Sequence, residues 1–318
     1  MKKTIYLFAF ASTLFIGKAY SQPAFSLINT NKMVFNPAYT AIDTAYRHSA
    51  SLYSQINSTA YQSPYSSSIG TYQMRLDKIK SGVGIMVNYN YDVFPSETDK
   101  QIAAKLYYRY TILPGFSVGA DAGLVNSNSN FQFTYNWNRG FVYPAIVYQT
   151  FPQQATVNNL AFDGGLGILY QHKSFYVGFG TDHLTSPKST YIAYNYESGS
   201  IDNFPIPMHN YSGISYNWII GSSVHGEAGG VNFSAAYRSN ILSLNTSLES
   251  SHIFVGFSMF YDVSGNSLQD MFINNGNYYA LTAGLKLWHN KINASFAYDY
   301  SGSFFSSATL EGGLSYSF

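Results

Sequence analysis

Short segments of strict alternation recur in this sequence from residue 49 to the last residue. In each segment, apolar or aromatic side chains take every second position, and small or polar side chains take the positions between them. The stretch "QIAAKLYYRYT" shows the pattern, with Ile102, Leu106 and Tyr110 on one face and Lys105 and Arg109 on the other. Successive strand side chains point to opposite sides, so each segment predicts a β-strand with one apolar and one polar face.

Fourteen such segments can be counted, and an even number of strands is typical of a transmembrane antiparallel β-barrel. The predicted strands are 49–56, 65–76, 82–91, 101–111, 115–124, 161–171, 174–183, 209–219, 229–237, 241–248, 252–261, 278–288, 291–300 and 308–318. Short connections, such as 77–81, 172–173 and 289–290, alternate with long ones, such as 125–160, 184–208 and 262–277. A barrel of this kind has short periplasmic turns and long extracellular loops. The links at 220–228 and 238–240 depart from this rule.

The composition favours a lipid environment over water. Only 10% of residues are Asp, Glu, Lys or Arg, whereas soluble domains carry about 25%. Aromatic residues reach 18%, with 30 Tyr and 24 Phe, and aromatic girdles mark the two membrane interfaces of a barrel. After the first twenty residues, no apolar run approaches the roughly 20 residues of a membrane-spanning helix. The sequence therefore predicts an all-β barrel in contact with the lipid bilayer.

The first residues have the layout of a secretory signal peptide. Two lysines precede an apolar run, Ile5–Ile16, and a small-residue site at Ala19–Ser21. We predict a signal peptide over 1–21, Sec export, and cleavage before Gln22. The mature chain then has 14 basic and 16 acidic residues, which does not provide the basic face that nucleic-acid binding requires. With no cysteine for disulfides, the chain fits the bacterial outer membrane.

The C-terminal residues have the alternation of a complete β-strand. Leu310, Leu314, Tyr316 and Phe318 alternate with small or polar residues up to the last position. In hydrocarbon no backbone polar group can stay unpaired, so a spanning sheet must close and the last strand must pair with the first. A strand ending in Phe with this alternation also resembles the C-terminal signal that the barrel assembly machinery recognises.

Catalytic and metal-binding motifs are not found in the sequence. Asp182 and His183 are adjacent, and adjacent strand residues face opposite sides, so we do not expect a catalytic pair. The seven histidines lack ligand spacing, and "DVSGNSLQD" at 262–270 lacks the Glu and spacing of an EF-hand. No P-loop, dinucleotide motif or nucleophile elbow is present. We therefore predict no catalytic residue, no metal site, no cofactor and no enzymatic activity.

Two features suggest contacts beyond the barrel wall. Lumen-facing Lys105 and Arg109 would attract an anionic solute or pair with Asp121 or Glu311. The stretches "FQFTYNWN" and "FVYPAIVY" flank 138–140 and predict a hairpin above the membrane. Its aromatic residues form either a docking surface or a lid folded over the lumen. They are Phe131, Phe133, Tyr135, Trp137 and Phe141.

Residues 22–48 lack the period of two, and here the sequence is similar to a known family. "FNPAYTA" soon after the signal site, followed by "HSASLYSQ", resembles the start of the PorP/SprF family of type IX secretion outer-membrane proteins. The likeness continues in "SGVGIMVNYNYD", "KLYYRYTI", "FSVGADAGL" and "SFYVGFGTDHLTSP", and it extends over essentially the whole mature chain.

The resemblance implies that the protein binds, helps export or anchors specific secreted surface proteins, adhesin-like, through their C-terminal sorting domains. It also implies a fourteen-stranded barrel like that of fatty-acid transporters. The predicted organisation is a signal peptide at 1–21, a plug or periplasmic cap at 22–48, and a barrel at 49–318. A direct partner-binding role for the motif in 22–48 stays open, as does a channel or transporter for hydrophobic or small solutes. The motif residues concerned are Phe35, Asn36, Pro37, Ala38 and Tyr39.

Overall fold

The structure is a computed structural model of the 318-residue chain. It describes residues 32–42, 46–58, 65–94, 97–138, 148–195, 200–207, 215–225, 229–238, 241–262, 278–287, 291–301 and 308–318. The 3₁₀-helices are η2 (Lys32–Val34), η3 (Pro37–Tyr39) and η4 (Asp77–Ile79). The strands are β1 (His48–Ser58), β2 (Tyr65–Leu76), β3 (Ser81–Phe94), β4 (Glu97–Leu113), β5 (Phe116–Asn138), β6 (Tyr148–His172), β7 (Phe175–Asp182), β8 (Lys188–Asn195), β9 (Ser200–Pro207), β10 (Ser215–His225), β11 (Gly230–Arg238), β12 (Ile241–Glu249), β13 (Ile253–Asp262), β14 (Tyr278–Leu287), β15 (Ile292–Ser301) and β16 (Ala308–Ser317).

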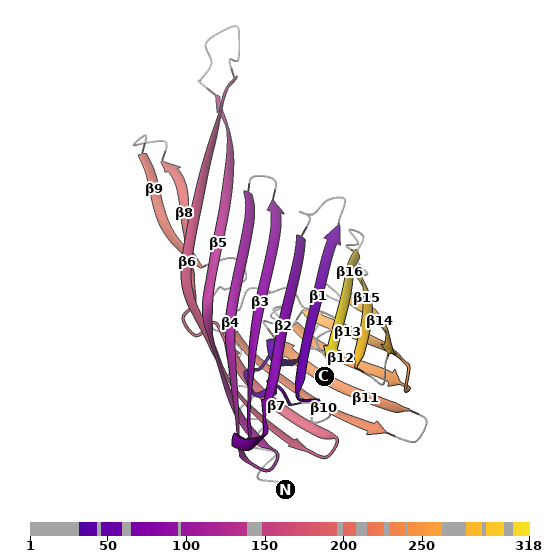
Figure 1. Cartoon of the computed structure of the whole chain (residues 1–318). Helices are drawn as coiled ribbons and strands as arrows, with labels where there is room; N and C mark the ends of the chain where they lie inside the picture. The colour runs from indigo at the N-terminus through magenta and orange to yellow at the C-terminus, as the bar shows by residue number, and fades with distance from the viewer. Residues whose placement is uncertain are drawn as a thin grey trace, which may run out of the picture.

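Fourteen of these strands form one closed antiparallel barrel, as predicted. Going around the wall, the order is β1-β16-β15-β14-β13-β12-β11-β10-β7-β6-β5-β4-β3-β2. Successive barrel strands are therefore neighbours, β1 closes on β16, and β8 and β9 form a separate sheet between β7 and β10 in the sequence (Figure 1). In the described part of the chain, no helix is long and apolar enough to cross a membrane. Closure leaves no open sheet edge, which is the condition for a sheet to span lipid.

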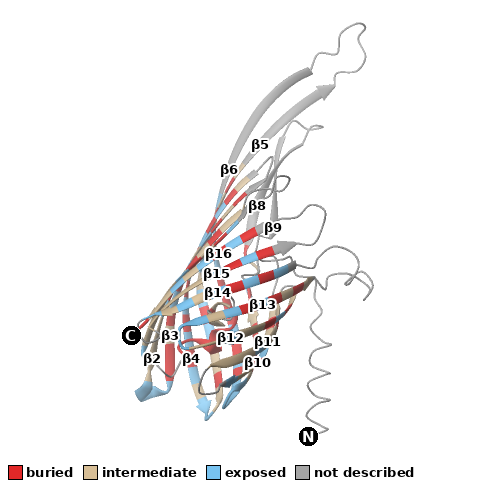
Figure 2. Cartoon of the chain, turned by 90° about the vertical axis from the view of Figure 1, so that its right-hand side faces the viewer, coloured by how far each residue is buried: buried red, intermediate tan, exposed pale blue. Residues whose placement is uncertain are grey.

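The predicted alternation appears as two faces of the wall. In β4, the side chains of Ile102 and Leu106 are 50% and 64% exposed, whereas Gln101, Lys105 and Arg109 are buried. The same alternation of buried and exposed residues runs along several strands in Figure 2. The exposed row is apolar because it faces lipid, and the buried row is polar because it faces the lumen.

The ends of the barrel can be told apart by their connections. Six links are short and lie at the same end of the barrel, namely those after β2, β4, β6, β10, β12 and β14. The first residue of β1 and the last residue of β16 lie at this end too. By the rule for outer-membrane barrels, this is the periplasmic end. β10 runs to His225, six residues beyond the end of the predicted strand 209–219, and this shortens the nine-residue link to 226–229. Residues 209–214 of the predicted strand lie outside the described residues. The sequence missed the extension because Gly221, Ser222 and Ser223 carry no apolar alternation.

The longest hairpin stands out from the barrel. The β4–β5 ladder ends at Glu97 paired with Phe131, and from there to Asn138 the described partner of β5 is β6 alone. Figure 1 shows β5 and β6 continuing past the ends of their neighbours. The hairpin was predicted, but its register was wrong. Residues 131–138 pair with 148–155 rather than with 141–148, because alternation alone does not fix the register across a long turn.

A second hairpin was missed altogether. β8 and β9 form a separate two-stranded sheet in a region predicted to be a loop, 184–208. Three prolines interrupt the alternation there, at positions 187, 205 and 207, and proline argues against a strand in a sequence-based assignment. Both hairpins lie on the extracellular side, where β8 packs near β6.

The seam between the first and last strands is formed along its full length. β1 and β16 pair from Ser49 with Ser317 to Ser58 with Ala308. The amide of His48 donates to the carbonyl of Phe318 and the amide of Phe318 donates to that of His48, each at 2.9 Å. The His48 and Phe318 rings stack with centroids 5.1 Å apart. The terminal phenylalanine is therefore part of the wall.

The four residues proposed as an assembly signal lie on this seam strand or directly after it. Leu310, Leu314 and Phe318 are exposed on the outer face, about half of each side chain remaining accessible. Tyr316 is half-buried and stacks on Phe318 at 5.2 Å. Their role as a signal stays a prediction.

Candidate functional site

The described part of the N-terminal segment, residues 32–42, lies against the inner face of the barrel. Proline at the first position of η3 suits a helix start, since its fixed φ fits a helix and it has no N–H to leave unsatisfied. Ala38 and Tyr39 pack on the buried lumenal side chains Leu169 and Ile219. On the other side, Met33 packs on Tyr107 and its neighbours. These partners lie on β2, β3, β4, β6, β10 and β11. The segment therefore fills the part of the lumen next to these strands, near its periplasmic end.

Asn36 ties this segment to the wall with both ends of its side-chain amide. Its Oδ1 accepts a hydrogen bond from the amide of Ala38 at 2.8 Å, which caps η3. Its Nδ2 donates to the carbonyls of Ile168 and Phe179, at 3.1 and 3.0 Å. These two residues are register partners on β6 and β7, so the amide bridges the two strands. Only an amide offers an acceptor and two donors in this arrangement.

Glycines on the inner face make room for the segment. A β-carbon on Gly119 would meet the backbone of Pro37 and Ala38, and one on Gly167 would overlap the Asn36 amide. The strand glycines whose β-carbon would meet residues 33–41 within 3.3 Å are Gly82, Gly84, Gly119, Gly167, Gly178 and Gly180. We call these six residues the glycine cradle. Glycine in a strand interior weakens the strand and marks a close approach of another backbone, which is what the segment makes here.

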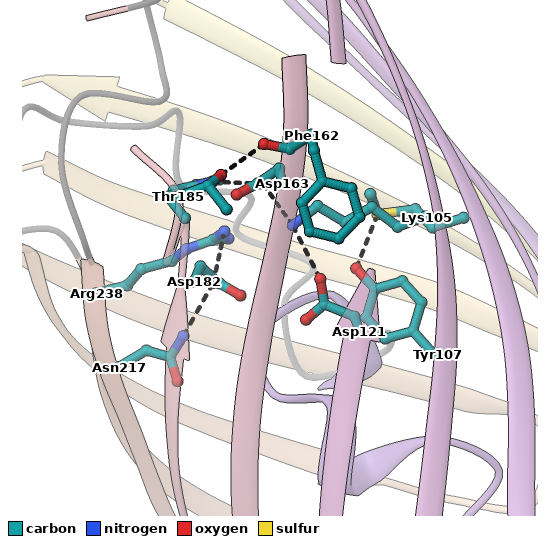
Figure 3. A network of polar contacts seen from close by, with 11 residues as sticks. Lys105, Tyr107, Asp121, Phe162, Asp163, Asp182, Thr185, Asn217 and Arg238 are labelled. Atoms are coloured by element: carbon teal, nitrogen blue, oxygen red, sulfur yellow. Dashed lines mark hydrogen bonds and ion pairs between the residues drawn. The ribbon is translucent and has the colours of Figure 1, made fainter. Parts of the chain in front are cut away.

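A network of buried charges lies next to the cradle, farther from the periplasmic end. The Nζ atom of Lys105 lies 3.0 Å from Asp121 and 2.7 Å from Asp163, and neither carboxylate is accessible to solvent (Figure 3). Asp182 accepts from Asn217 at 3.0 Å and pairs with Arg238 at 3.2 Å. A β-carbon on Gly165 would meet both Asp121 and Asp182, so the two groups adjoin.

His183 corrects an expectation from the sequence. Asp182 and His183 were expected to face opposite sides, but both are buried in the lumen. His183 follows the end of β7 and has φ +59°, and this left-handed backbone turns its side chain inward. Its Nδ1 lies 2.7 Å from Asp163. The histidine thus pairs with Asp163 on β6.

Cation contacts connect the network to the N-terminal segment. The Arg238 guanidinium lies 4.6 Å from the centre of the Phe35 ring, a distance typical of a cation–π contact. Arg109 donates to the carbonyl of Ala41 at 3.3 Å. The sequence left two alternatives for Lys105 and Arg109: attraction of an anionic solute, or pairing with Asp121 or Glu311. Lys105 pairs with Asp121. Glu311 instead accepts from Gln55 across the seam.

The predicted site residues fall into two groups. The five motif residues, Phe35 to Tyr39, come together on the inner wall and are almost fully buried. Of the aromatic loop residues, Phe131, Phe133, Tyr135 and Trp137 occupy alternate positions of β5, but only their backbone is described, and Phe141 lies outside the described residues. The predicted signal peptide and the 262–270 loop, apart from Asp262, also lie outside them. No cluster of potential metal ligands occurs among the described residues.

Fourteen closed strands with a lipid-facing apolar row and a polar lumen define an outer-membrane β-barrel. The chain belongs to the PorP/SprF family of type IX secretion system membrane proteins, whose family model matches residues 17–313. This confirms the resemblance noted in the sequence and places the protein in the outer membrane as a component of a secretion system.

Solved outer-membrane barrels share the fold. A structure described as the CymD monoaromatic hydrocarbon channel is 14% identical, with 95% of each chain covered and a TM-score of 0.58. A Pseudomonas aeruginosa FadL homologue is 9% identical, with 89% of this chain and 93% of that chain covered and a TM-score of 0.57. At these identities the likeness concerns the fold alone. Among individually curated proteins, none matches the sequence.

Proposed function

We propose that this barrel receives and anchors particular secreted proteins of the type IX pathway, adhesin-like in character, through their C-terminal sorting domains. The observation that carries the proposal is the family match over residues 17–313. In this view the barrel is a rigid base in the membrane and has no catalytic role. Gliding motility or another surface task would then depend on the cargo.

The β5–β6 hairpin is the proposed docking element. It extends beyond the last β4–β5 pair, and its described backbone beyond that point pairs with itself alone. Four aromatic residues occupy alternate positions of β5 there. A cargo domain would gain from burying aromatic surface and from adding a strand to a long hairpin.

The N-terminal segment has a supporting role in this proposal. Residues 22–48 act as a plug, held by Asn36 and the glycine cradle, that stiffens the β2–β7 side of the barrel. The near-complete burial of Phe35 and Tyr39 favours this role over direct contact with cargo. The barrel assembly machinery would engage the outward row of Leu310, Leu314 and Phe318 before the barrel closes.

Shortening the hairpin tests the proposal. Asn130 pairs with Thr156, so replacing 131–155 by Asn-Gly leaves a two-residue turn with the barrel register intact. We expect the variant to assemble normally but to lose co-purification and surface display of the exported protein with a C-terminal sorting domain that the wild type retains. Undiminished cargo display by the shortened barrel would contradict the proposal.

A matched pair of variants separates aromatic docking from hairpin length. Replacing Phe131, Phe133, Tyr135 and Trp137 by Ser should release the cargo. Replacing the intervening polar residues Gln132, Thr134, Asn136 and Asn138 by Ser should not. Equal cargo binding by both variants would show that the aromatic positions do not carry the interaction.

A channel or transporter for hydrophobic or small solutes is the second candidate. The fold likeness to a hydrocarbon channel favours it. It predicts solute uptake or conductance in liposomes that increases when residues 32–42 are released from the wall. Purified barrel that gives neither signal, with or without that segment, would exclude this second function.

A further inference from the structure

A polar cavity occupies the other side of the lumen, beside the strands β10 to β16 and β1. It encloses about 370 Å³ and is lined by 17 of the described residues, 11 of which are Ser, Thr or Asn. This volume lies within the range of roughly 300–1,000 Å³ that is usual for small-molecule sites. Most such sites are mainly apolar, so a lining dominated by hydroxyl and amide groups suits a ligand rich in hydroxyl groups.

The cavity lies toward the periplasm. Glu249 is the last residue of β12 and Lys286 is the next to last of β14, and both precede short periplasmic turns. Lys286 Nζ and Glu249 Oε2 pair at 2.7 Å, and their side chains remain 19% and 28% exposed. Asn232 Nδ2 also donates to Glu249 at 2.6 Å. These groups, near the periplasmic end of the lumen, are therefore in contact with solvent.

One cation of the cavity, Lys32, lies against aromatic rings. The Nζ atom of Lys32 lies 3.9 Å from the centre of the Tyr176 ring and 5.9 Å from that of Tyr39. Among the described residues, no Asp or Glu lies within ion-pair distance of Lys32, and the nearest cavity carboxylate, Glu249, is bound to Lys286 and Asn232. Buried charges are normally paired. Burial lowers the pKa of Lys32 from 10.5 to about 8, which leaves it mostly protonated at neutral pH.

The charges of the lining set the charge of the ligand. Among the lining residues that the structure describes, Lys32 and Lys286 against Glu249 leave one net positive charge. A ligand with one negative charge restores neutrality, whereas a phosphate monoester would carry close to two. The rings of Tyr53, Tyr176 and Phe254 also line the cavity and offer flat apolar surfaces to the carbon skeleton of a ligand.

We propose that this cavity binds a small hydroxylated monocarboxylate of the uronic-acid class from the periplasm. The Lys32 ammonium takes the carboxylate in a charge-assisted hydrogen bond. The Ser, Thr and Asn side chains exchange hydrogen bonds with the hydroxyl groups, and the aromatic rings pack on the faces of the sugar ring. This site is independent of the cargo surface on the opposite side of the membrane.

Calorimetry on the purified full-length mature barrel in detergent at pH 7 tests the proposal. Glucuronate should bind saturably and at least about tenfold more tightly than glucose, because only glucuronate forms the charge-assisted hydrogen bond to Lys32. Glucose 6-phosphate should bind more weakly than glucuronate. Absence of saturable glucuronate binding, or equal binding of glucose, would overturn the proposal, and tighter binding of glucose 6-phosphate would overturn the carboxylate assignment.

Variants of the lining test whether glucuronate binds in this cavity. Lys32→Met should lower glucuronate affinity about tenfold or more, and Lys78→Met, which changes an exposed lysine in the periplasmic η4 turn, should leave it unchanged. Asn293→Phe fills the cavity without touching the Lys32 charge and should abolish binding, so the test does not depend on one variant folding. Wild-type affinity in both cavity variants would place the glucuronate elsewhere and overturn the proposal.

Discussion

The side-chain amide of Asn36 lies where a β-carbon of Gly167 would stand. Because Gly167 has no side chain, the lumenal face of β6 has room for the N-terminal segment at this position. The same amide also donates to two wall carbonyls, so its position is fixed by hydrogen bonds and has little freedom to shift. The segment and the wall are complementary at the level of individual atoms.

Gly167→Ala should displace the segment, because the added methyl group overlaps the Asn36 amide. We expect trypsin to cleave after Lys32 faster than in the wild type, as followed by mass spectrometry of the detergent-solubilised barrel. Gly312→Ala is the matched control, since a β-carbon at this strand glycine meets nothing within 4 Å. Equal cleavage rates in all three proteins would show that the cradle does not hold the segment.

Asn36→Asp separates the two functions of the amide. The carboxylate keeps an acceptor for the Ala38 amide but places negative charge against the carbonyls of Ile168 and Phe179. Asn36→Ala loses the cap and both wall bonds, at a cost of about 1–3 kcal/mol for release of the segment. We expect hydrogen exchange of residues 32–42 to rise at least about fivefold in Asn36→Ala and further in Asn36→Asp. Protection at the wild-type level in Asn36→Asp would contradict the bridging role of Nδ2.

The barrel itself could be predicted from the sequence, because period-two alternation is imposed by lipid on one face and by the lumen on the other. The two faces of β4 follow from that rule, and the closing role of the last strand follows from the need to pair every backbone polar group in lipid. Lys105 meeting Asp121 was one of two open alternatives. What alternation leaves undetermined is register across long turns, which is why the partner of 131–138 was wrong.

The centre of the candidate site could be predicted only in part. The strand glycines in "GVGIM" and "GGLGILY" indicated close packing, but a glycine does not specify what approaches it. Asp163 joins Lys105 only through the spatial order of β4, β5 and β6. The inward turn of His183 depends on a positive φ, which is uncommon for a residue other than glycine and has no signature in this sequence.

Lys105→Met should destabilise the barrel strongly. The change leaves Asp121 and Asp163 buried without their shared cation, and breaking a buried pair costs about 3–5 kcal/mol. We expect a lower guanidinium midpoint of unfolding, partly restored by adding Asp163→Asn, which removes one of the carboxylates. Lys100→Met, at an exposed position of the same strand, is the control. Additive effects of the two changes would mean that Lys105 and Asp163 are not coupled.

Deleting Phe318 should impair closure of the barrel. The deletion removes both backbone hydrogen bonds to His48 and the ring stacked on it, so the seam loses its periplasmic end. We expect a smaller fraction of the chain in the outer membrane to show the heat-dependent electrophoretic mobility of a folded barrel. Phe296→Ala removes an equally exposed ring from β15 and should assemble normally. Full assembly without Phe318 would rule out its proposed role.

The affinity for glucuronate should fall as pH rises through about 8. The ligand binds the protonated form of Lys32, whose pKa is lowered from 10.5 to about 8 by burial and is held up in part by Glu249. Tyr39 faces the same ammonium, and burial raises its pKa, so it stays neutral through this range. Calorimetry at pH 6.5, 8 and 9.5 should show an affinity that is about halved at pH 8, where half of Lys32 is protonated, and that falls further at pH 9.5. Lys32→Arg should keep its affinity at pH 9.5, because a guanidinium remains charged there. The same decline in both proteins would assign the titration to another group.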